Sequence, residues 1–424
     1  MRSIFNKINY LVKSGFFHIF SSSVFNKIIV FVSNIIIIRI VSKSDFGVYS
    51  YALNIVSLVL LFTGLGLVSG TFQLCSECGD DIKRKKHIFE YGCSHGSRFN
   101  LVLAGIILGI ACFVPLPIYG AHNILKTMCF FPVVYIIFEF QQIYLRSDLR
   151  NKEYAYSTTF NTAFVMIFSV LGAIVLGIEG LVIGRYIAYI FTIVFIVKMY
   201  KVMPSFKNNE ISENDKKTLW AFSVTSMCNN GISELLYLLD VFILGLVVLD
   251  EQIIASYKVA TVIPTACTFI PLAVITYVYP YFAKNREDYE WSLEKYSVLL
   301  KCIGALNFIV SLFMFVFAEL IIIIVYGENY LDATICFRIL AINYFISGTF
   351  RIISGNLLVT QRKLKFNLYI NILCGLINVL GNVILIPKYG SVGAALSTLI
   401  VVIVSSIIST SYYVYVLKSK NGGN

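Results

Sequence analysis

Long apolar stretches alternate with short polar connections along almost the whole chain. A helix needs about 20 apolar residues to cross a bilayer, and the sequence contains twelve stretches of about that length. Their apolar positions are continuous and not alternating, which favours transmembrane helices over a membrane β-barrel. The predicted spans are 16–41, 46–72, 99–119, 124–146, 156–176, 180–200, 219–247, 253–281, 298–325, 333–358, 368–386 and 392–417. This pattern predicts an all-α polytopic membrane protein.

The composition agrees with this fold class. Hydrophobic residues make up 58% of the 424 residues and charged residues only 13%, a balance that soluble globular domains do not have. The first apolar stretch is too long for the core of a signal peptide and is followed by no small-residue cleavage site. We therefore predict that it is retained as the first span.

The basic residues lie mostly on one side of the predicted spans. Most of the 34 Lys and Arg residues fall at the two ends of the chain or in the even-numbered connections, and only Lys43, Lys126 and Lys388 fall in connections on the other side. The positive-inside rule therefore places both termini in the cytoplasm. Basic segments beside anionic lipid headgroups also account for the net charge of +11. We predict membrane lipids as partners, and no nucleic acid.

The chain divides into two halves, 1–207 and 208–424, at a hydrophilic connection around 201–217. A shift of 208 residues places the start of the second span, at 46–52, over the start of the eighth, at 254–260. Six spans in each half make this repeat parallel, as in transporters built from two similar bundles. Substrates of such transporters bind between the halves.

One group of Cys and His residues lies in or beside the connection after the second span. Its members are Cys75, Cys78, His87, Cys93 and His95. The Cys-x-x-Cys spacing is compatible with zinc, but chance clustering is the favoured interpretation, because most of the ten cysteines lie in apolar stretches where Cys acts as a small hydrophobe. We predict no metal site.

Three motifs carry a resemblance to a known family. They are Arg39-Ile40-Val41-Ser42-Lys43-Ser44-Asp45-Phe46-Gly47-Val48-Tyr49, Val325-Tyr326-Gly327-Glu328-Asn329-Tyr330-Leu331-Asp332-Ala333, and Asn378-x-x-x-Asn382-x-x-x-Ile386-Pro387-Lys388-Tyr389-Gly390-Ser391-Val392-Gly393-Ala394-Ala395. In this order, over the whole chain, they resemble the polysaccharide-export branch of the multidrug/oligosaccharidyl-lipid/polysaccharide (MOP) exporter superfamily. Within that branch the chain is most similar to Wzx-type O-antigen flippases.

The resemblance implies a fold and a function. It implies two six-helix bundles with a MATE-like arrangement, in the bacterial inner membrane. It also implies translocation of undecaprenyl-pyrophosphate-linked O-antigen units from the cytoplasmic to the periplasmic leaflet by alternating access. An O-antigen polymerase and a chain-length regulator would then be partners in lipopolysaccharide biosynthesis.

Six basic residues fall within the predicted spans, where contact with lipid is costly. They are Lys27, Arg39, Arg185, Lys258, Arg338 and Arg351. Lys and Arg bind phosphate through charge-assisted hydrogen bonds, so these residues are candidate contacts for a pyrophosphate. Lys27 ranks first because it is near the middle of its span, and Arg351 ranks second. For the other four, snorkelling or pairing between helices is the alternative.

The seventh span carries two carboxylates, Glu234 and Asp240. They are candidates either for pairing with the basic residues, which is the favoured role, or for binding a coupling ion. The sequence does not choose between a proton and a sodium ion. No cofactor is predicted.

We predict that the protein is not an enzyme, since no Gly-x-x-x-x-Gly-Lys motif is present in the sequence. Two other functions remain open. One is a multidrug or cation antiporter of the same superfamily, since the fold alone does not determine the cargo. The other is a membrane polysaccharide polymerase or glycosyltransferase, which the shortness of the non-cytoplasmic connections disfavours.

Overall fold

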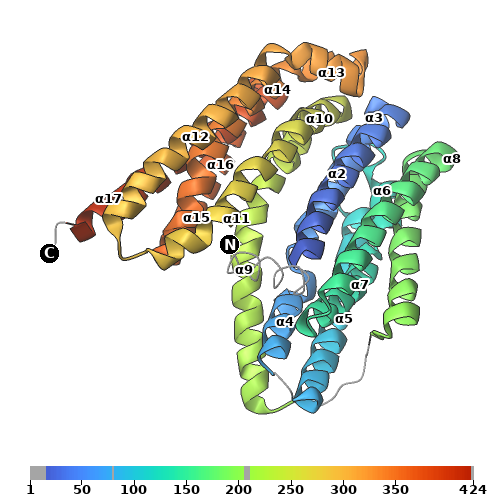
Figure 1. Ribbon diagram of the computed structural model, residues 1–424. Coiled ribbons are helices and arrows are strands. Elements are labelled where there is room, and N and C mark those ends of the chain that lie inside the picture. The colour runs from blue at the N-terminus through green and yellow to red at the C-terminus, as the bar shows by residue number, and fades with distance from the viewer. Residues whose placement is uncertain (1–15, 79–80, 205–210, 422–424) are drawn as a thin grey trace. The chain divides into compact units, whose positions relative to one another are not determined.

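The computed structural model describes residues 16–78, 81–204 and 211–421, and within these ranges all the regular structure is helical. The chain forms two compact units, Met1–Gly231 (unit 1) and Ile232–Asn424 (unit 2). Unit 1 contains α2 (Phe16–Ile40), α3 (Lys43–Leu60), η1 (Thr63–Gly66), α4 (Leu67–Glu77), α5 (Ile82–Phe113), α6 (Ala121–Met128), α7 (Phe131–Ser147), α8 (Asn151–Tyr200) and the first part of α9 (Glu213–Val248) (Figure 1). Unit 2 contains the rest of α9, α10 (Glu251–Cys267), α11 (Phe269–Lys284), α12 (Tyr289–Val316), α13 (Ala318–Tyr326), η2 (Glu328–Ala333), α14 (Thr334–Ile346), η3 (Ser347–Arg351), α15 (Ile352–Thr360), α16 (Leu364–Tyr389) and α17 (Ser391–Asn421).

The described residues contain nine helical segments long and apolar enough to cross a membrane, or ten if the bent pair α6 and α7 counts as one span. One of them, α8, has 50 residues and non-helical backbone angles at Leu176 and Gly177. It therefore holds two of the predicted spans, 156–176 and 180–200, since one crossing needs only about 20 residues. The seventh predicted span lies in α9. The predicted all-α polytopic class is confirmed.

Hydropathy located the apolar part of each helix but not its ends. Residues 82–98, predicted as a connection, are helical, because α5 begins at Ile82. Asp81 caps this helix by accepting a hydrogen bond from the backbone N–H of Arg84 at 3.0 Å. The cap satisfies a backbone N–H group at the start of the helix. The helix can therefore begin outside the apolar stretch, in a segment with charged side chains.

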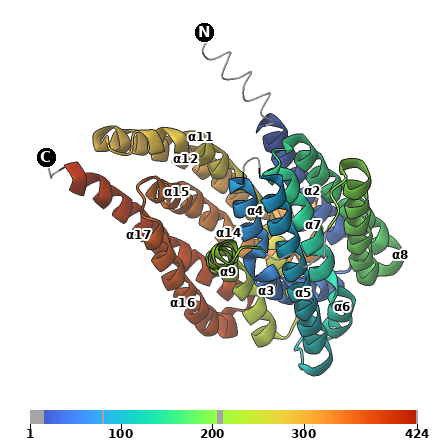
Figure 2. The same cartoon turned by 90° about the horizontal axis from the view of Figure 1, so that it is seen from below.

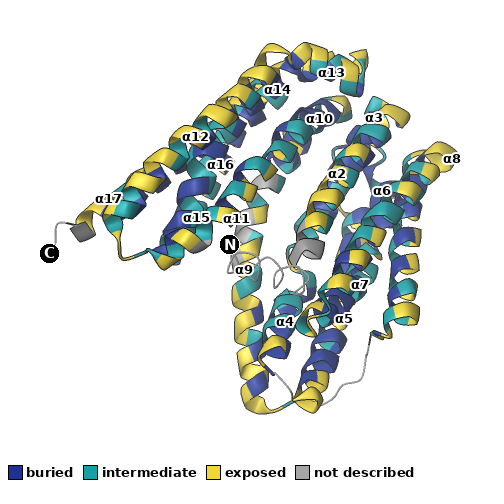
Figure 3. Cartoon of the chain, in the orientation of Figure 1, coloured by how far each residue is buried: buried dark blue, intermediate teal, exposed yellow. Residues whose placement is uncertain are grey.

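The surface of the helices is strongly apolar. Figure 3 shows many exposed residues along α12, and these include Phe308, Ile309 and Phe313, with exposed fractions of 52%, 64% and 57%. A soluble monomer rarely exposes such a continuous apolar surface. Lipid covers a surface of this kind in a multi-pass membrane protein.

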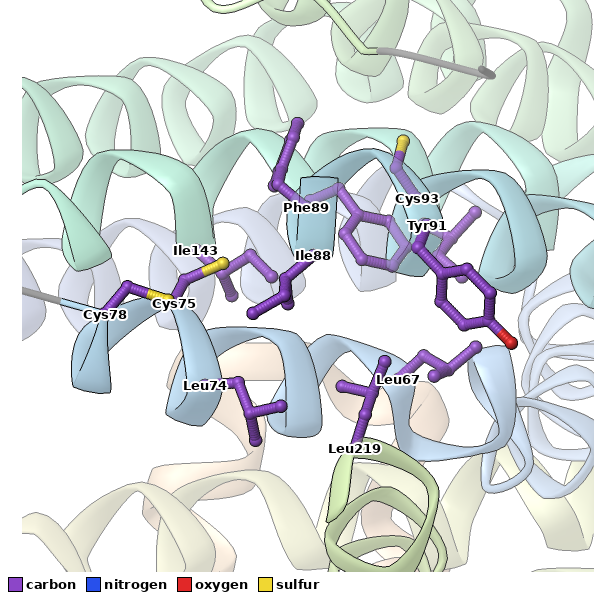
Figure 4. Close-up of a cluster of buried hydrophobic side chains, with 12 residues drawn as sticks. Leu67, Leu74, Cys75, Cys78, Ile88, Phe89, Tyr91, Cys93, Ile143 and Leu219 are labelled. Carbon is purple, nitrogen blue, oxygen red and sulfur yellow. The ribbon is translucent and has the colours of Figure 1, made fainter. Parts of the chain in front are cut away.

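The core of unit 1 contains the cysteines considered above as metal ligands. Cys75, Cys78 and Cys93 lie in a buried hydrophobic cluster with side chains of α4, α5, α7 and α9 (Figure 4). The Cys75 thiol donates to the carbonyl of Lys85 at 3.6 Å, and the His95 Nδ1 lies 2.9 Å from the Tyr91 carbonyl. Among the described residues, no group of three or more His, Cys, Asp or Glu could hold a metal ion.

An ion pair joins the start of α9 to α5 in the same unit. The Arg84 guanidinium donates to both carboxylate oxygens of Asp215, at 2.5 and 3.2 Å. This hydrogen bonding lowers the pKa of Asp215 below its usual value. Together with Leu219 in the hydrophobic cluster, the pair anchors the first part of α9 to unit 1.

Two glycines break the helix between α3 and α4. Gly64 and Gly66 have φ angles of +52° and +77°, which only glycine adopts readily. A Cβ on Gly66 would lie 2.1 Å from the Ser223 carbonyl oxygen on α9. The α3–α4 break therefore depends on glycine for both backbone conformation and close packing.

Gly66→Ala is expected to destabilise the protein by about 1–3 kcal/mol or more, because it adds backbone strain to the clash with Ser223. Thermal unfolding in detergent, followed by scanning fluorimetry, would measure the loss. The matched control is Gly105→Ala, because a Cβ there meets no atom within 4 Å. Equal melting temperatures for the two variants would contradict the prediction.

The core of unit 2 combines apolar packing with buried hydrogen bonds. The helices α16 and α17 lie side by side (Figure 2). Small residues allow the two helices to pack this closely. A Cβ on Gly393, for example, would lie only 2.3 Å from the Leu385 carbonyl oxygen. Nearby, the Tyr344 hydroxyl donates to Asn307 at 2.8 Å, and Ser311 donates to the Ala341 carbonyl at 2.7 Å.

Candidate functional site

A buried carboxylate on α9 is surrounded by hydrogen-bond donors from three other helices of unit 2. Asp240 is only 5% exposed. Its Oδ2 accepts hydrogen bonds from the Tyr257 hydroxyl of α10 at 2.9 Å and from the Thr398 hydroxyl of α17 at 2.6 Å. Its Oδ1 accepts from the amides of Asn378 and Asn382 on α16, at 2.9 and 2.8 Å. We call these five residues the Asp240 cage.

Local sequence explains how α16 and α17 contribute to the cage. Asn378 and Asn382 are four residues apart, so they project from the same face of the helix. The Asn382 amide also donates to Asn378 Oδ1 at 3.2 Å, which orders the two side chains together. After the turn at Gly390, α17 packs closely against α16, and this brings the Thr398 hydroxyl to Asp240.

The cage is suited to a charged group in an apolar environment. Burial of a carboxylate is costly unless hydrogen bonds replace the lost water, and here four neutral donors do so. One positive side chain lies nearby: Lys258 follows Tyr257 on α10, is partly exposed, and interacts electrostatically with Asp240. The carboxylate is therefore held in place without a close ion pair in the cage itself.

The cage also offers oxygen atoms to a small cation. Asn382 Oδ1 is buried and has no hydrogen-bond partner among the described residues. Rotation of the Asn378 and Asn382 amides would present carbonyl oxygens where the donors now point. With the carboxylate and the Thr398 hydroxyl, these atoms make an oxygen-rich set of the kind that hard cations prefer. A proton on Asp240 is the other charge that the site could hold.

The structure separates the two carboxylates that the sequence grouped as ion-coupling or pairing candidates. Asp240 is in the cage, whereas the Glu234 side chain is exposed on the same helix. The sequence did not identify Tyr257, Asn378, Asn382 or Thr398 as site residues. The pair of asparagines in an apolar span, at helical spacing, was the signal that could have found part of the cage.

Three of the predicted phosphate contacts are in unit 1. Lys27 is exposed at the middle of α2, and Arg39 is exposed in the last turn of the same helix. The guanidinium of Arg185 on α8 is partly exposed and lies 5.8 Å from the centre of the Phe131 ring.

The other three predicted contacts are in unit 2. Lys258 is beside the Asp240 cage on α10. Arg338 Nε donates to the Phe315 carbonyl at 3.3 Å, which is a contact between helices of the kind considered as the alternative to substrate binding. Arg351 is half-buried in the π-helical turn η3 and lies near the Cys374 thiol.

Comparison with known proteins identifies the family and the fold. The sequence model of the family described as polysaccharide biosynthesis protein matches residues 36–335. No curated protein sequence matches the chain.

Several solved structures are similar. An inward-facing multidrug resistance MATE family transporter of the MOP superfamily has a TM-score of 0.73 and 14% identity, and the match covers 94% of this chain and 96% of that chain. The lipid II flippase MurJ in an inward closed conformation has a TM-score of 0.72 and 16% identity, with coverage of 94% and 87%. A MOP superfamily transporter from Pyrococcus furiosus has a TM-score of 0.62 and 12% identity, with coverage of 96% of each chain.

These matches confirm the predicted resemblance to the MOP superfamily and the MATE-like fold. These structural neighbours are themselves described as transporters and a flippase. The family model covers well over half of the sequence, and the structural matches cover nearly all of it. The chain therefore belongs to the polysaccharide biosynthesis protein family, as a multi-pass membrane protein with the fold of the MOP superfamily transporters and flippases.

Proposed function

We propose that the protein is a flippase for undecaprenyl-pyrophosphate-linked O-antigen units. It moves them from the cytoplasmic to the periplasmic leaflet of the bacterial inner membrane by alternating access between two six-helix bundles, residues 1–207 and 208–424. The observation that carries this proposal is the set of basic side chains at membrane depth in a chain of the polysaccharide biosynthesis family.

The position of Lys27 gives the strongest support. An ammonium at the middle of an apolar helix is costly against lipid, yet Lys27 is exposed on α2. It therefore needs an aqueous or ligand-filled environment. A pyrophosphate supplies two negative groups for Lys and Arg donors, whereas a drug cation would be repelled by them.

Asp240 supports a second part of the proposal, which is ion coupling. Four helices of unit 2 contribute to the cage, so a cation bound there would hold α9, α10, α16 and α17 in one arrangement. An ion can bias a conformational equilibrium only through different affinity for the two states. We propose that a sodium ion or a proton at Asp240 favours one of the two access states.

Deletion of the gene tests the proposed function directly. We expect undecaprenyl-pyrophosphate-linked repeat units to accumulate in the cytoplasmic leaflet of the deletion strain, as measured by accessibility to a membrane-impermeant sugar-modifying reagent in oriented vesicles. The wild-type gene should restore delivery to the periplasmic leaflet.

Other outcomes would support a different function. Accumulation of single repeat units on the periplasmic side would indicate a polymerase or glycosyltransferase. Normal O-antigen together with increased sensitivity to toxic cations would indicate a multidrug or cation antiporter.

A further inference from the structure

Unit 1 contains a carboxyl group at membrane depth that the proposed mechanism does not use. Glu139 is half-buried on α7 and hydrogen-bonds to the Tyr135 hydroxyl, one helical turn earlier. The Tyr189 hydroxyl on α8 lies near Glu139 and hydrogen-bonds to Asn161. An intramembrane carboxylate is costly and commonly marks a functional site.

Aromatic rings lie beside this carboxyl, and a guanidinium lies over one of these rings. The Tyr189 ring lies 6.2 Å from Tyr135 and 5.4 Å from Phe131, measured between ring centres, in edge-to-face arrangements. The Arg185 guanidinium lies over the same Phe131 ring and near the Tyr189 hydroxyl. We call Tyr135, Glu139, Asn161, Arg185 and Tyr189 the Glu139 face.

One polar atom of the Glu139 face indicates that a ligand binds there. Asn161 is only 7% exposed, and its Oδ1 is buried without a hydrogen-bond partner among the described residues. A buried amide oxygen without a partner is costly in free energy. The tyrosines, Glu139 and Arg185 beside it are partly exposed, so a ligand could reach the group from the open side.

The chemistry of the Glu139 face distinguishes among ligands. A lipid tail would gain nothing from a carboxylate, an amide and two phenols, and a pyrophosphate would be repelled by Glu139. A sugar ring offers hydroxyl groups that both donate and accept, together with apolar C–H faces that pack on aromatic rings. Carboxylate, guanidinium and amide groups beside such rings match this combination of polar and apolar contacts.

We propose that the Glu139 face binds a sugar of the cargo and contributes to saccharide selection. The inference rests on the proposed flippase function and adds a location for the saccharide in unit 1. It assigns Arg185 to the saccharide instead of the pyrophosphate. Glu139 accepts hydrogen bonds from sugar hydroxyls, Arg185 and the Tyr189 phenol donate to sugar oxygens, and the aromatic rings pack against the C–H face of the sugar. The Tyr135 hydroxyl donates to Glu139 and holds this carboxylate in position.

Direct binding of two lipids tests the inference. The probes are undecaprenyl pyrophosphate and the lipid-linked saccharide extracted from cells that lack the protein, each titrated into the full-length protein in nanodiscs. We expect wild type to bind the saccharide-bearing lipid more tightly than the bare lipid. Glu139→Gln is expected to weaken binding of the saccharide-bearing lipid about tenfold, as for loss of a hydrogen bond to a charged group, and to leave binding of the bare lipid unchanged.

Glu179→Gln is the matched control, because Glu179 is exposed on α8 and is not part of the Glu139 face; it should change neither affinity. Tyr135→Phe removes one hydroxyl from a partly exposed ring, and it should reduce the saccharide preference even if Glu139→Gln fails to fold. Equal effects of Glu139→Gln on both lipids, or no effect on either, would overturn the inference.

Two wild-type results separate this inference from the proposed function. Equal affinity for the two lipids would overturn the sugar site alone, while binding of neither lipid would overturn the flippase proposal as well. Tight binding of tetraphenylphosphonium that is lost in Glu139→Gln would assign the face to organic cations and would also overturn the sugar site.

Discussion

Asp240→Asn is expected to abolish the response of the protein to the proposed coupling ion. The substitution keeps the shape of the side chain but removes the negative charge that a cation in the Asp240 cage would neutralise. In wild type, an ion at about 100 times its dissociation constant should stabilise the folded state by about 2.7 kcal/mol. This stabilisation should be absent from the variant, and transport into proteoliposomes driven by an ion gradient should fall at least tenfold, about 1.4 kcal/mol.

The measurement also identifies the ion. Melting temperatures are compared in NaCl and KCl at constant pH, and then over a pH series without sodium. Sodium-specific stabilisation would assign Na⁺ to the cage, and a pH response that is lost in Asp240→Asn would assign a proton. Glu234→Gln is the matched control, because Glu234 is an exposed carboxylate on the same helix. An unchanged ion response in Asp240→Asn would contradict the assignment.

Lys27→Gln is expected to reduce delivery of lipid-linked repeat units to the periplasmic leaflet by about tenfold or more. The estimate corresponds to loss of one charge-assisted hydrogen bond, about 1.5–3 kcal/mol. Lys27→Arg keeps a positive charge that can donate to phosphate and should retain most of the activity. The measurement is periplasmic exposure of the saccharide in a complemented deletion strain, at equal protein level in the membrane.

The control for this prediction is Lys126→Gln. Lys126 is exposed at the end of the short helix α6 and lies outside the predicted set of phosphate contacts, so its neutralisation should leave transport unchanged. Equal transport by wild type and Lys27→Gln would remove Lys27 from the substrate pathway. Equal losses in both variants would indicate a general effect of positive charge and not a specific contact.

The candidate site was only partly accessible from the sequence. Lys27 and Asp240 stand out because ionisable residues are rare in apolar spans, and hydropathy alone places them at membrane depth. The polar partners of Asp240 do not stand out in this way, since Asn, Thr and Tyr are tolerated in transmembrane helices. The cage residues Asn378, Asn382 and Thr398 are 138, 142 and 158 positions away from Asp240 along the chain, so no local pattern links them.

The two carboxylates of α9 also show that the sequence does not predict which side chains become buried. Glu234 and Asp240 have the same chemistry and lie in the same predicted span, so the sequence grouped them as one pair of candidates. Only the packing of α10, α16 and α17 around Asp240 makes one of them buried and hydrogen-bonded, while the other stays exposed. Similarly, Glu139 was one of several acidic residues in the predicted spans, and its aromatic surroundings depend on contacts between α7 and α8.

The sequence by itself determined the all-helical membrane fold, the approximate spans and the family resemblance, because burial in lipid imposes apolar segments of a length that can be read directly. It also limited the candidate functional residues to a short set of ionisable side chains. The tertiary structure decided which of these side chains are enclosed and by what. Hydrogen bonding and close packing join residues from distant helices, and these interactions exist only after the helices have assembled.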